Sequence, residues 1–244
     1  MQLLILGYGK MGRTIAQLAE ARGHTVAATI DRADEARWQS LDSQAIDVAI
    51  EFSQPDAAEA NVRRCLERNI PVVSGTTGWL DQKPALDAYC REQDGTFFYA
   101  SNFSVGVNLF FRLNEALAAM MNHYPAYSPS LEEIHHTEKK DAPSGTAITL
   151  VEGLLAHLKH KQEWTLQEEG DHPAPLADHQ LLIRSVREGK VPGTHIIRYQ
   201  SDVDTIEIKH TAHSRQGFAQ GAVLVAEWLP GRKGVLGMND FLSY

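Results

Sequence analysis

Short apolar runs alternate with amphipathic segments through the first hundred residues of the chain. Five apolar runs predict buried β-strands, at residues 2–6, 25–30, 46–52, 70–74 and 96–100. Three segments between them repeat their apolar residues at helical spacing, at residues 11–21, 55–67 and 83–91. Strands that alternate with helices are typical of a parallel sheet covered on both faces, so this half of the chain is predicted to be α/β.

The pattern changes after residue 103. Long amphipathic helices are predicted at 107–121 and 146–160, and residues 131–136 between them alternate in the manner of a strand. A loop-rich stretch then leads to three strand-like runs, at residues 181–187, 195–200 and 205–211. These runs predict a mixed or antiparallel sheet. A last apolar helix, 218–229, is expected to pack back on the first half.

A glycine-rich turn joins the first strand to the first helix, and it reads Gly7-Tyr8-Gly9-Lys10-Met11-Gly12. This G-x-G-x-x-G pattern lies between a strand and a helix, the context in which such a turn binds the pyrophosphate of a dinucleotide. A glycine-rich turn without a ligand is the alternative. The motif favours a Rossmann-type parallel sheet and two domains. Residues 1–103 with 218–244 are predicted to bind the dinucleotide, and residues 104–217 to form an α+β substrate domain.

Two neighbouring residues end the second strand and bear on the cofactor. Asp31 can accept hydrogen bonds from the ribose hydroxyls of NAD, whereas Arg32 can neutralise the 2′-phosphate of NADP. A solvated ion pair is the alternative to both roles. The sequence therefore leaves open whether the chain uses NADH, NADPH or both.

Two later strands end in polar turns that are further candidates for cofactor binding. These turns are Gly75-Thr76-Thr77-Gly78 and Ala100-Ser101-Asn102-Phe103. Ligands of open parallel sheets bind at the carboxyl ends of the strands, so both turns are expected to face the cofactor, although turn formation alone would also explain them.

The end of the predicted strand 131–136 combines proton chemistry with positive charge. His135 and His136 are adjacent, so their side chains point to opposite faces and do different work. Lys139 can hold an anion or stabilise a developing negative charge. Ser144-Gly145-Thr146 opens a helix, whose first N–H groups can bind a carboxylate. Purely structural histidines are the alternative to this catalytic anion site.

Composition and the remaining histidines narrow the possibilities. The net charge of −8 argues against non-specific nucleic-acid binding. The two cysteines and the absence of a leader or a long apolar run predict a cytoplasmic protein that does not bind membranes. No metal site is expected, because the pairs His157/His160 and His210/His213 have no obvious third ligand nearby in the sequence.

Several blocks of sequence are similar to those of one enzyme family. The segment His135-His136-Thr137-Glu138-Lys139-Lys140-Asp141-Ala142-Pro143-Ser144-Gly145-Thr146-Ala147 resembles the H-H-x-x-K-x-D-A-P-S-G-T-A signature of the 4-hydroxy-tetrahydrodipicolinate (dihydrodipicolinate) reductases. The turn at 75–78 is similar to the G-T-T-G turn of that family, and residues 101–108 to its A-N-F-S-V-G-V-N segment. Further matching blocks follow in order, at residues 185–189, 193–195, 213–215 and 218–222.

The resemblance implies a reaction and a division of roles. It implies NADH- or NADPH-dependent reduction of 4-hydroxy-tetrahydrodipicolinate to tetrahydrodipicolinate, with loss of water, in lysine biosynthesis through diaminopimelate. Under it, His135 transfers the proton, and Lys139 assists and binds the substrate. The carboxylates of the substrate would be held by His136, Ser144, Gly145 and Thr146. The resemblance also implies a homotetramer assembled through the sheet of the second domain.

The chain departs from the family pattern in three places, one of them being Ser101 where the family has alanine. Its glycine turn is one residue shorter than the common G-x-x-G-x-M-G form, and the short stretch between Asp31 and Ile46 predicts a turn in place of a helix.

Two other functions compete with this reductase. Another Rossmann oxidoreductase, such as an amino-acid or sugar dehydrogenase, would need a different substrate signature after residue 104. A catalytically idle NAD(P)-binding sensor or scaffold would bind cofactor without turnover, and the intact set of histidine, lysine and helix start argues against it.

Overall fold

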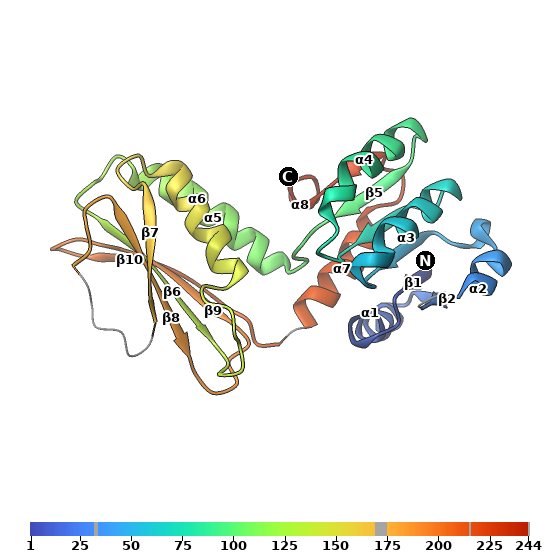
Figure 1. Cartoon of the computed structure of the whole chain (residues 1–244), viewed down its shortest axis with the longest axis horizontal. Helices are drawn as coiled ribbons and strands as arrows, with labels where there is room; N and C mark the ends of the chain where they lie inside the picture. The colour runs from blue at the N-terminus through green and yellow to red at the C-terminus, as the bar shows by residue number, and fades with distance from the viewer. Residues whose placement is uncertain (32–33, 169–174, 215, 244) are drawn as a thin grey trace. The chain divides into compact units, whose positions relative to one another are not determined.

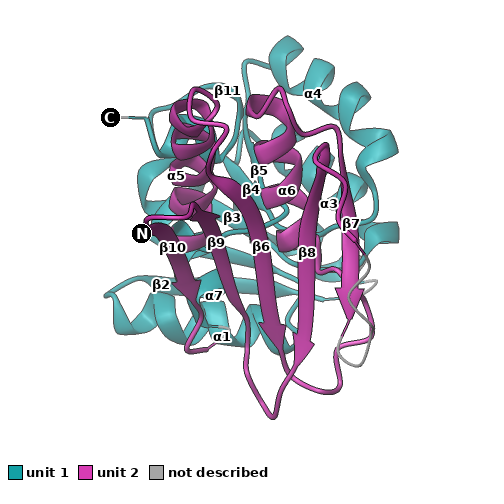
Figure 2. Cartoon of the chain, turned by 90° about the vertical axis from the view of Figure 1, so that its left-hand side faces the viewer, with its two compact units in different colours: residues 1–105, 216–244 teal, residues 106–215 magenta. Residues whose placement is uncertain are grey.

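The structure is a computed structural model that describes residues 1–31, 34–168, 175–214 and 216–243. The chain folds into two compact units, Met1–Val105 with Gln216–Tyr244 and Gly106–Arg215 (Figure 2). Within the described residues, no helix is both long and apolar enough to span a bilayer.

The first unit contains a six-stranded sheet in which all neighbouring strands are parallel. Its strands, in their order across the sheet, are β11 (Gly234–Leu236), β5 (Thr96–Tyr99), β4 (Val72–Ser74), β3 (Val48–Glu51), β1 (Gln2–Leu6) and β2 (Thr25–Ile30). The chain moves from β1 outward to β2 and then returns to the other side of β1 for β3. The carboxyl ends of β1 and β3 therefore form the switch point at which such sheets bind ligands.

Helices cover both faces of this sheet (Figure 1). They are α1 (Lys10–Ala21), α2 (Glu35–Ser40), α3 (Pro55–Glu67), α4 (Lys83–Glu92), α7 (Gln216–Trp228) and α8 (Met238–Phe241). Alternate residues of β1 face opposite layers: Leu3 and Ile5 pack with α1 and α7, and Leu4 and Leu6 pack with α3 and α4. The predicted return of the C-terminal helix to the first half is confirmed.

Some elements of the first unit differ from expectation. The predicted turn between Asp31 and Ile46 is wrong, because α2 and a 3₁₀ helix at Ser43–Ala45 occupy this stretch. Side-chain caps from Asp34 and Asp42 allow such short helices to form. The pattern also missed β11, whose three residues are too few to show a period, and the four-residue α8.

The second unit is a mixed five-stranded sheet with two helices along one face (Figure 1). Its strands, in order across the sheet, are β10 (Thr205–Thr211), β9 (Thr194–Gln200), β6 (Ser128–His135), β8 (Gln180–Arg187) and β7 (Glu163–Glu168). The helices are α5 (Val105–Met121) and α6 (Gly145–His157). Strand β9 runs antiparallel to β6 and β10, whereas β6, β7 and β8 are mutually parallel. Both predicted sheets, and with them the predicted fold class, are confirmed.

Strand β6 has the predicted alternation. Leu131, Glu133 and His135 are buried on the face that α5 and α6 cover, and the residues between them are half-buried. Two local expectations are wrong: β7 lies in the stretch predicted as loop, and α6 ends at His157, so His160 is outside the helix. Strand β7 reads EWTLQE, whose few apolar residues hid it.

Candidate active site

The glycine turn after β1 requires glycine at two positions for steric reasons. Gly7 has φ of +85°, and a Cβ there would lie 2.3 Å from the carbonyl oxygen of Phe52. A Cβ at Gly12 would lie 2.0 Å from the carbonyl oxygen of Gly7. Gly9 differs, because a Cβ there would meet no atom within 4 Å. Gly7 and Gly12 therefore allow the tight turn, and Gly9 leaves open space where a pyrophosphate would approach.

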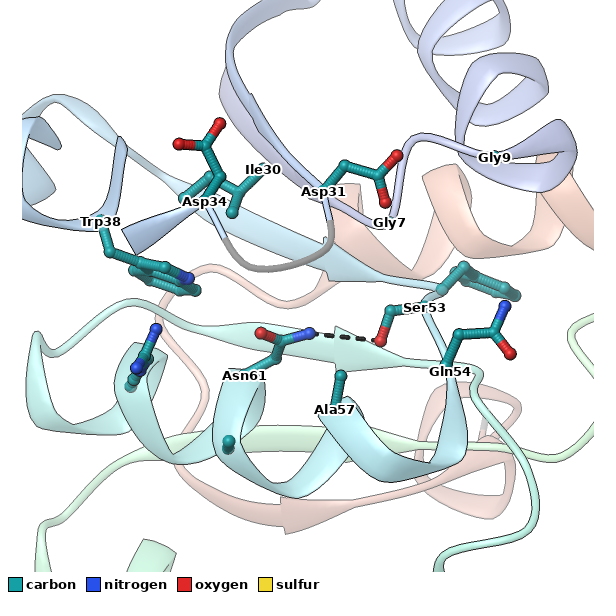
Figure 3. A pocket seen from close by; sticks show the side chains of 13 residues that line it. Gly7, Gly9, Ile30, Asp31, Asp34, Trp38, Ser53, Gln54, Ala57 and Asn61 are labelled. Carbon is teal, nitrogen blue, oxygen red and sulfur yellow. Dashed lines mark hydrogen bonds between the residues drawn. The ribbon is translucent and has the colours of Figure 1, made fainter. Parts of the chain in front are cut away.

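Two adjoining cavities lie in the first unit beside this turn. The first, of about 340 Å³, is lined by Gly7, Gly9 and Asp31, with Asp34, Trp38 and Arg64 among the other residues (Figure 3). The second, of about 400 Å³, is lined by predicted cofactor residues, namely Met11, Gly75, Thr76, Thr77, Ser101 and Phe103. Both cavities are also lined by Phe52, Ser53 and Gln54. The residues present thus fit a dinucleotide, whose two halves need two adjoining spaces.

The other predicted cofactor residues have more local environments. Tyr8 lies under the guanidinium of Arg13 at 5.6 Å, and Lys10 is exposed at the start of α1. Ala100 is buried in the core, and Asn102 Oδ1 accepts a hydrogen bond from the N–H of Ser104. Arg32 lies outside the described residues.

A buried carboxylate that the sequence analysis missed organises the turns after β3 and β4. Glu51 is fully buried at the end of β3. Its oxygens accept hydrogen bonds from the N–H and hydroxyl of Ser53, from Ser74 Oγ at 2.6 Å and from Thr76 Oγ1 at 2.8 Å. The Thr76 hydroxyl therefore donates its hydrogen bond within the protein and stabilises the fold. An acidic residue inside the apolar run IDVAIEF was the available signal.

In the second unit, His135 lies at the end of β6 within a cluster of buried polar groups. Its Nδ1 is 3.2 Å from Oε2 of Glu133, and its ring centre is 5.2 Å from that of His195. Strand register explains the cluster, because Glu133 lies between Ser185 on β8 and His195 on β9. Strand alternation places Glu133 on the same side of β6 as His135, but no motif in the sequence marks it.

Lys139 lies in the loop after β6 and is anchored there. Its Nζ donates hydrogen bonds to both carboxylate oxygens of Asp141, at 2.8 and 2.7 Å. Arg187 of β8 braces the same loop through a 2.7 Å hydrogen bond to the carbonyl oxygen of Asp141. The Lys139 ammonium lies four residues after His135 in the sequence and is paired with the Asp141 carboxylate. An anionic ligand would have to displace this carboxylate or bind beside it.

The start of α6 supplies the third predicted component. Ser144 caps this helix: its Oγ accepts from the N–H of Ala147, and its own N–H donates to Glu133 at 3.1 Å. Ser144 is buried, so its polar groups serve the fold. Gly145 is exposed and Thr146 half-exposed, and their N–H groups precede the first hydrogen bond within the helix. The predicted substrate residue His136 directly follows β6 and is half-buried.

The cluster also brings together atoms that could hold a metal ion. One potential ligand atom from each of Glu133, His135 and His195 lies within 4.8 Å of the others, a set that sequence spacing did not indicate. However, Glu133 Oε1 already accepts from Ser185 Oγ at 2.7 Å and from the Arg187 guanidinium at 3.2 Å. A guanidinium on the shared carboxylate is a poor neighbour for a second cation, so the arrangement favours a proton network.

Burial controls the charges in this cluster. Burial and the nearby charge of His135 lower the pKa of His195 to about 3. Burial alone would raise the pKa of Glu133, but its contact with His135 and the hydrogen bonds from Ser144 and Ser185 hold that pKa well below its usual range. Near neutral pH the cluster therefore contains an ionised carboxylate and an uncharged His195.

This burial predicts acid lability. When unfolded, His195 takes up a proton below about pH 6.5, whereas the folded chain resists it until about pH 3. We expect the free energy of unfolding to fall by about 1.4 kcal/mol per pH unit from this residue alone, once the pH is well below 6.5. Thermal unfolding at several pH values above 4.5 measures how the free energy of unfolding depends on pH. In His195→Gln this free energy should fall less steeply as the pH is lowered. Equal slopes would contradict the assignment.

A Rossmann-type unit with a glycine turn after its first strand, joined to an α+β unit, is the architecture of many two-domain oxidoreductases that use pyridine nucleotides. The fold is shared with the dipicolinate-bound dihydrodipicolinate reductase from Paenisporosarcina sp. TG-14, with a TM-score of 0.75 over 100% of both chains at 19% identity. An engineered D-amino acid dehydrogenase bound to NADP⁺ has a TM-score of 0.53 at 14% identity, over 97% of this chain and 92% of its own.

Sequence comparison names the family within this class. The family model described as dihydrodipicolinate reductase, N-terminus, matches residues 1–103, and the C-terminus model matches 106–242. The 4-hydroxy-tetrahydrodipicolinate reductase of Christiangramia forsetii is 47% identical over 100% of this chain and 98% of its own. That of Neisseria meningitidis serogroup C is 37% identical over 81% of this chain and 72% of its own. The chain belongs to the dihydrodipicolinate reductase family, as its signature predicted.

Proposed function

We propose that this chain reduces 4-hydroxy-tetrahydrodipicolinate to tetrahydrodipicolinate and water, with NADH or NADPH as the reductant, in lysine biosynthesis through diaminopimelate. The observation that carries the proposal is the grouping of His135, the Lys139 loop and the open start of α6 in a chain 47% identical to a reductase of that name over its full length.

The roles of the chain's residues follow from their chemistry. When bound, the nicotinamide supplies the hydride. His135 supplies the proton that balances it, because a protonated imidazole near neutral pH is a suitable general acid. Lys139 and the N–H groups of Gly145 and Thr146 bind the carboxylates of the substrate, together with His136, and so fix its orientation. Ser144 supports this site indirectly as the cap of α6.

The first unit is proposed to bind the dinucleotide along its two cavities. The cavity that contains Asp31 would take the adenosine half, and the cavity with Met11 and the turns at 75–77 and 101–103 would take the nicotinamide half. Such placement follows the rule that ligands bind at the switch point of a parallel sheet.

The activity is tested by following nicotinamide absorbance with purified protein and freshly made 4-hydroxy-tetrahydrodipicolinate. Substrate-dependent decay with either cofactor supports the proposal. Cofactor binding without decay would favour the idle sensor instead. Pyridine-2,6-dicarboxylate, a planar mimic of the substrate, should raise the thermal midpoint of the protein if the dicarboxylate site is present.

The choice of cofactor is expected to depend on Asp31. Its carboxylate would accept hydrogen bonds from the ribose and repel a 2′-phosphate. We predict that Asp31→Ala raises the KM for NADH about tenfold or more and lowers the KM for NADPH. Michaelis constants for both cofactors, measured side by side, give the result. Asp202→Ala, an exposed change in the second unit, serves as the control, and a parallel shift of both constants would argue against this role.

We further propose a cytoplasmic homotetramer that assembles through the sheet face opposite α5 and α6. This face combines apolar residues with ion pairs, such as Arg198 with Glu207 at 2.6 Å and Arg184 with Glu132 at 3.7 Å. Light scattering after size-exclusion chromatography measures the assembly. The free, buried Cys65 and Cys90 are compatible with a reducing compartment.

A further inference from the structure

Glu133 is a fully buried carboxylate two residues before the proposed acid, on the same face of β6. Burying a charge is costly unless it is paired and hydrogen-bonded, and a strand position in a core could have been filled by an apolar residue. The chain instead surrounds this carboxylate with donors. A buried charge at this position therefore indicates a functional role for Glu133. The contacts of its two carboxylate oxygens show what that role is.

The two oxygens of Glu133 have different partners. Oε1 accepts from Ser185 Oγ at 2.7 Å and from Arg187 Nη2 at 3.2 Å, so the neutralising cation lies on this side. Oε2 is 3.2 Å from Nδ1 of His135. Ser144 donates its N–H to both, at 3.1 Å each. The carboxylate is therefore held by Ser185, Arg187 and Ser144, and its Oε2 faces the His135 ring, with Nε2 of His195 farther away at 3.8 Å.

We propose that Glu133 is the positioning residue of His135: it holds the ring with Nδ1–H toward Oε2 and so leaves Nε2 as the atom that gives the proton to the substrate. The proposal rests on the proposed function only for the identity of that substrate. A carboxylate behind an imidazole fixes its tautomer and orientation and stabilises its charged form.

Space at the opposite ring nitrogen agrees with this assignment. A Cβ at Gly193 would lie only 3.0 Å from Nε2 of His135, so glycine at this position keeps that nitrogen clear. At Nδ1, the 3.2 Å contact lacks the alignment of a regular hydrogen bond. Contacts of catalytic groups are often loose before the substrate binds and tighten in the complex.

Arg187 connects this carboxylate to the other proposed catalytic group. Besides Glu133, its guanidinium donates to the carbonyl oxygen of Asp141 at 2.7 Å and to that of Lys139 at 3.4 Å. The same arginine thus neutralises the carboxylate behind His135 and braces the loop that carries Lys139. This arrangement keeps the two groups in a fixed relation within the second unit.

Several charged or titratable groups belong to the elements around His135. They are Glu133 on its own strand, His195 on β9, Arg187 on β8 and Lys139 in the following loop. The uncharged His195 adds little field near neutral pH, and the two cations oppose protonation of the imidazole. Glu133 is the one anion among these four groups, so Glu133→Gln removes the only negative charge of the set, and the pH dependence of kcat is the readout of that loss.

The experiment compares Glu133→Gln with Glu152→Gln in the full-length protein. Glu152 is an exposed glutamate of α6 in the same unit, away from the proposed site and the proposed assembly face. We expect Glu133→Gln to lower kcat about 10- to 100-fold with little change in the KM for substrate or in NADH affinity. The fall of kcat at high pH should begin at lower pH than in the wild type. Glu133→Asp should restore part of kcat, and Glu152→Gln should change none of these quantities.

Nuclear magnetic resonance of the histidine rings gives a test that needs no activity and no change at Glu133. Long-range ¹⁵N–¹H correlation should show His135 of the wild type protonated on Nδ1 when neutral, with the signal assigned by its loss in His135→Gln. This result supports the proposal even if the wild type proves inactive, in which case the proposed function alone fails. A proton on Nε2 would overturn the proposal. So would a Glu133→Gln enzyme with kcat within about twofold of the wild type, or one whose pH profile does not move.

Discussion

His135→Gln is expected to lower kcat about 100- to 10,000-fold, the range that a general acid contributes, with a much smaller change in the KM for substrate. Glutamine keeps a polar group of similar reach at the end of β6 but has no proton to give near neutral pH. The measurement is the steady-state decay of nicotinamide absorbance across a range of substrate concentrations. Since the proton is needed only as the hydride is delivered, the loss should fall on kcat rather than on binding.

A matched histidine change makes this result specific. His179→Gln alters an exposed imidazole of the same unit, 3.3 Å from Glu163, and should leave kcat and the thermal midpoint unchanged. NADH binding by His135→Gln, measured by fluorescence, should equal that of the wild type, because the glycine turn belongs to the other unit. If kcat of His135→Gln stays within about twofold of the wild-type value, His135 is not the acid.

Gly12→Ala is expected to lower the free energy of unfolding by about 3 kcal/mol, which is the upper end of the range for overpacking. The added Cβ would lie 2.0 Å from the carbonyl oxygen of Gly7, and backbone atoms cannot move aside as a flexible side chain can. Helix α1 would have to shift away from the turn, so cofactor binding should weaken as well. Chemical denaturation and NADH titration measure the two effects.

Gly9→Ala separates the two roles of the same turn. Gly9 has φ of −75° and open space where a Cβ would lie, so alanine should change the free energy of unfolding by less than about 0.5 kcal/mol. The same methyl group would stand where the pyrophosphate approaches, so the KM for cofactor should rise strongly. Equal stability losses in both variants would contradict the steric argument, and an unchanged KM for Gly9→Ala would place the pyrophosphate elsewhere.

Periodicity predicted those elements that are long enough to repeat. Helix α3 begins and ends at the predicted residues, Pro55 and Glu67, because an N-terminal proline and a full amphipathic face mark it. Strand β6 shows its alternation because one face meets α5 and α6. In contrast, β7 and β11 are edge strands whose formation depends on pairing with β8 and β5. The partner of β11 lies far away in the sequence, and β7 pairs with the next strand across a long connection, so no local pattern reveals either strand.

Residues that are neighbours along the chain were enough to establish the family, the two kinds of sheet and the presence of His135, Lys139 and the glycine turn, because each of these features is local. The buried carboxylates that support these features could be recognised only in the tertiary structure. Glu51 organises turns of β3 and β4, and Glu133 meets Ser185, Arg187 and His195 through the register of three strands. Strand pairing brings together residues about 50 to 60 positions apart, and burial then fixes their charges.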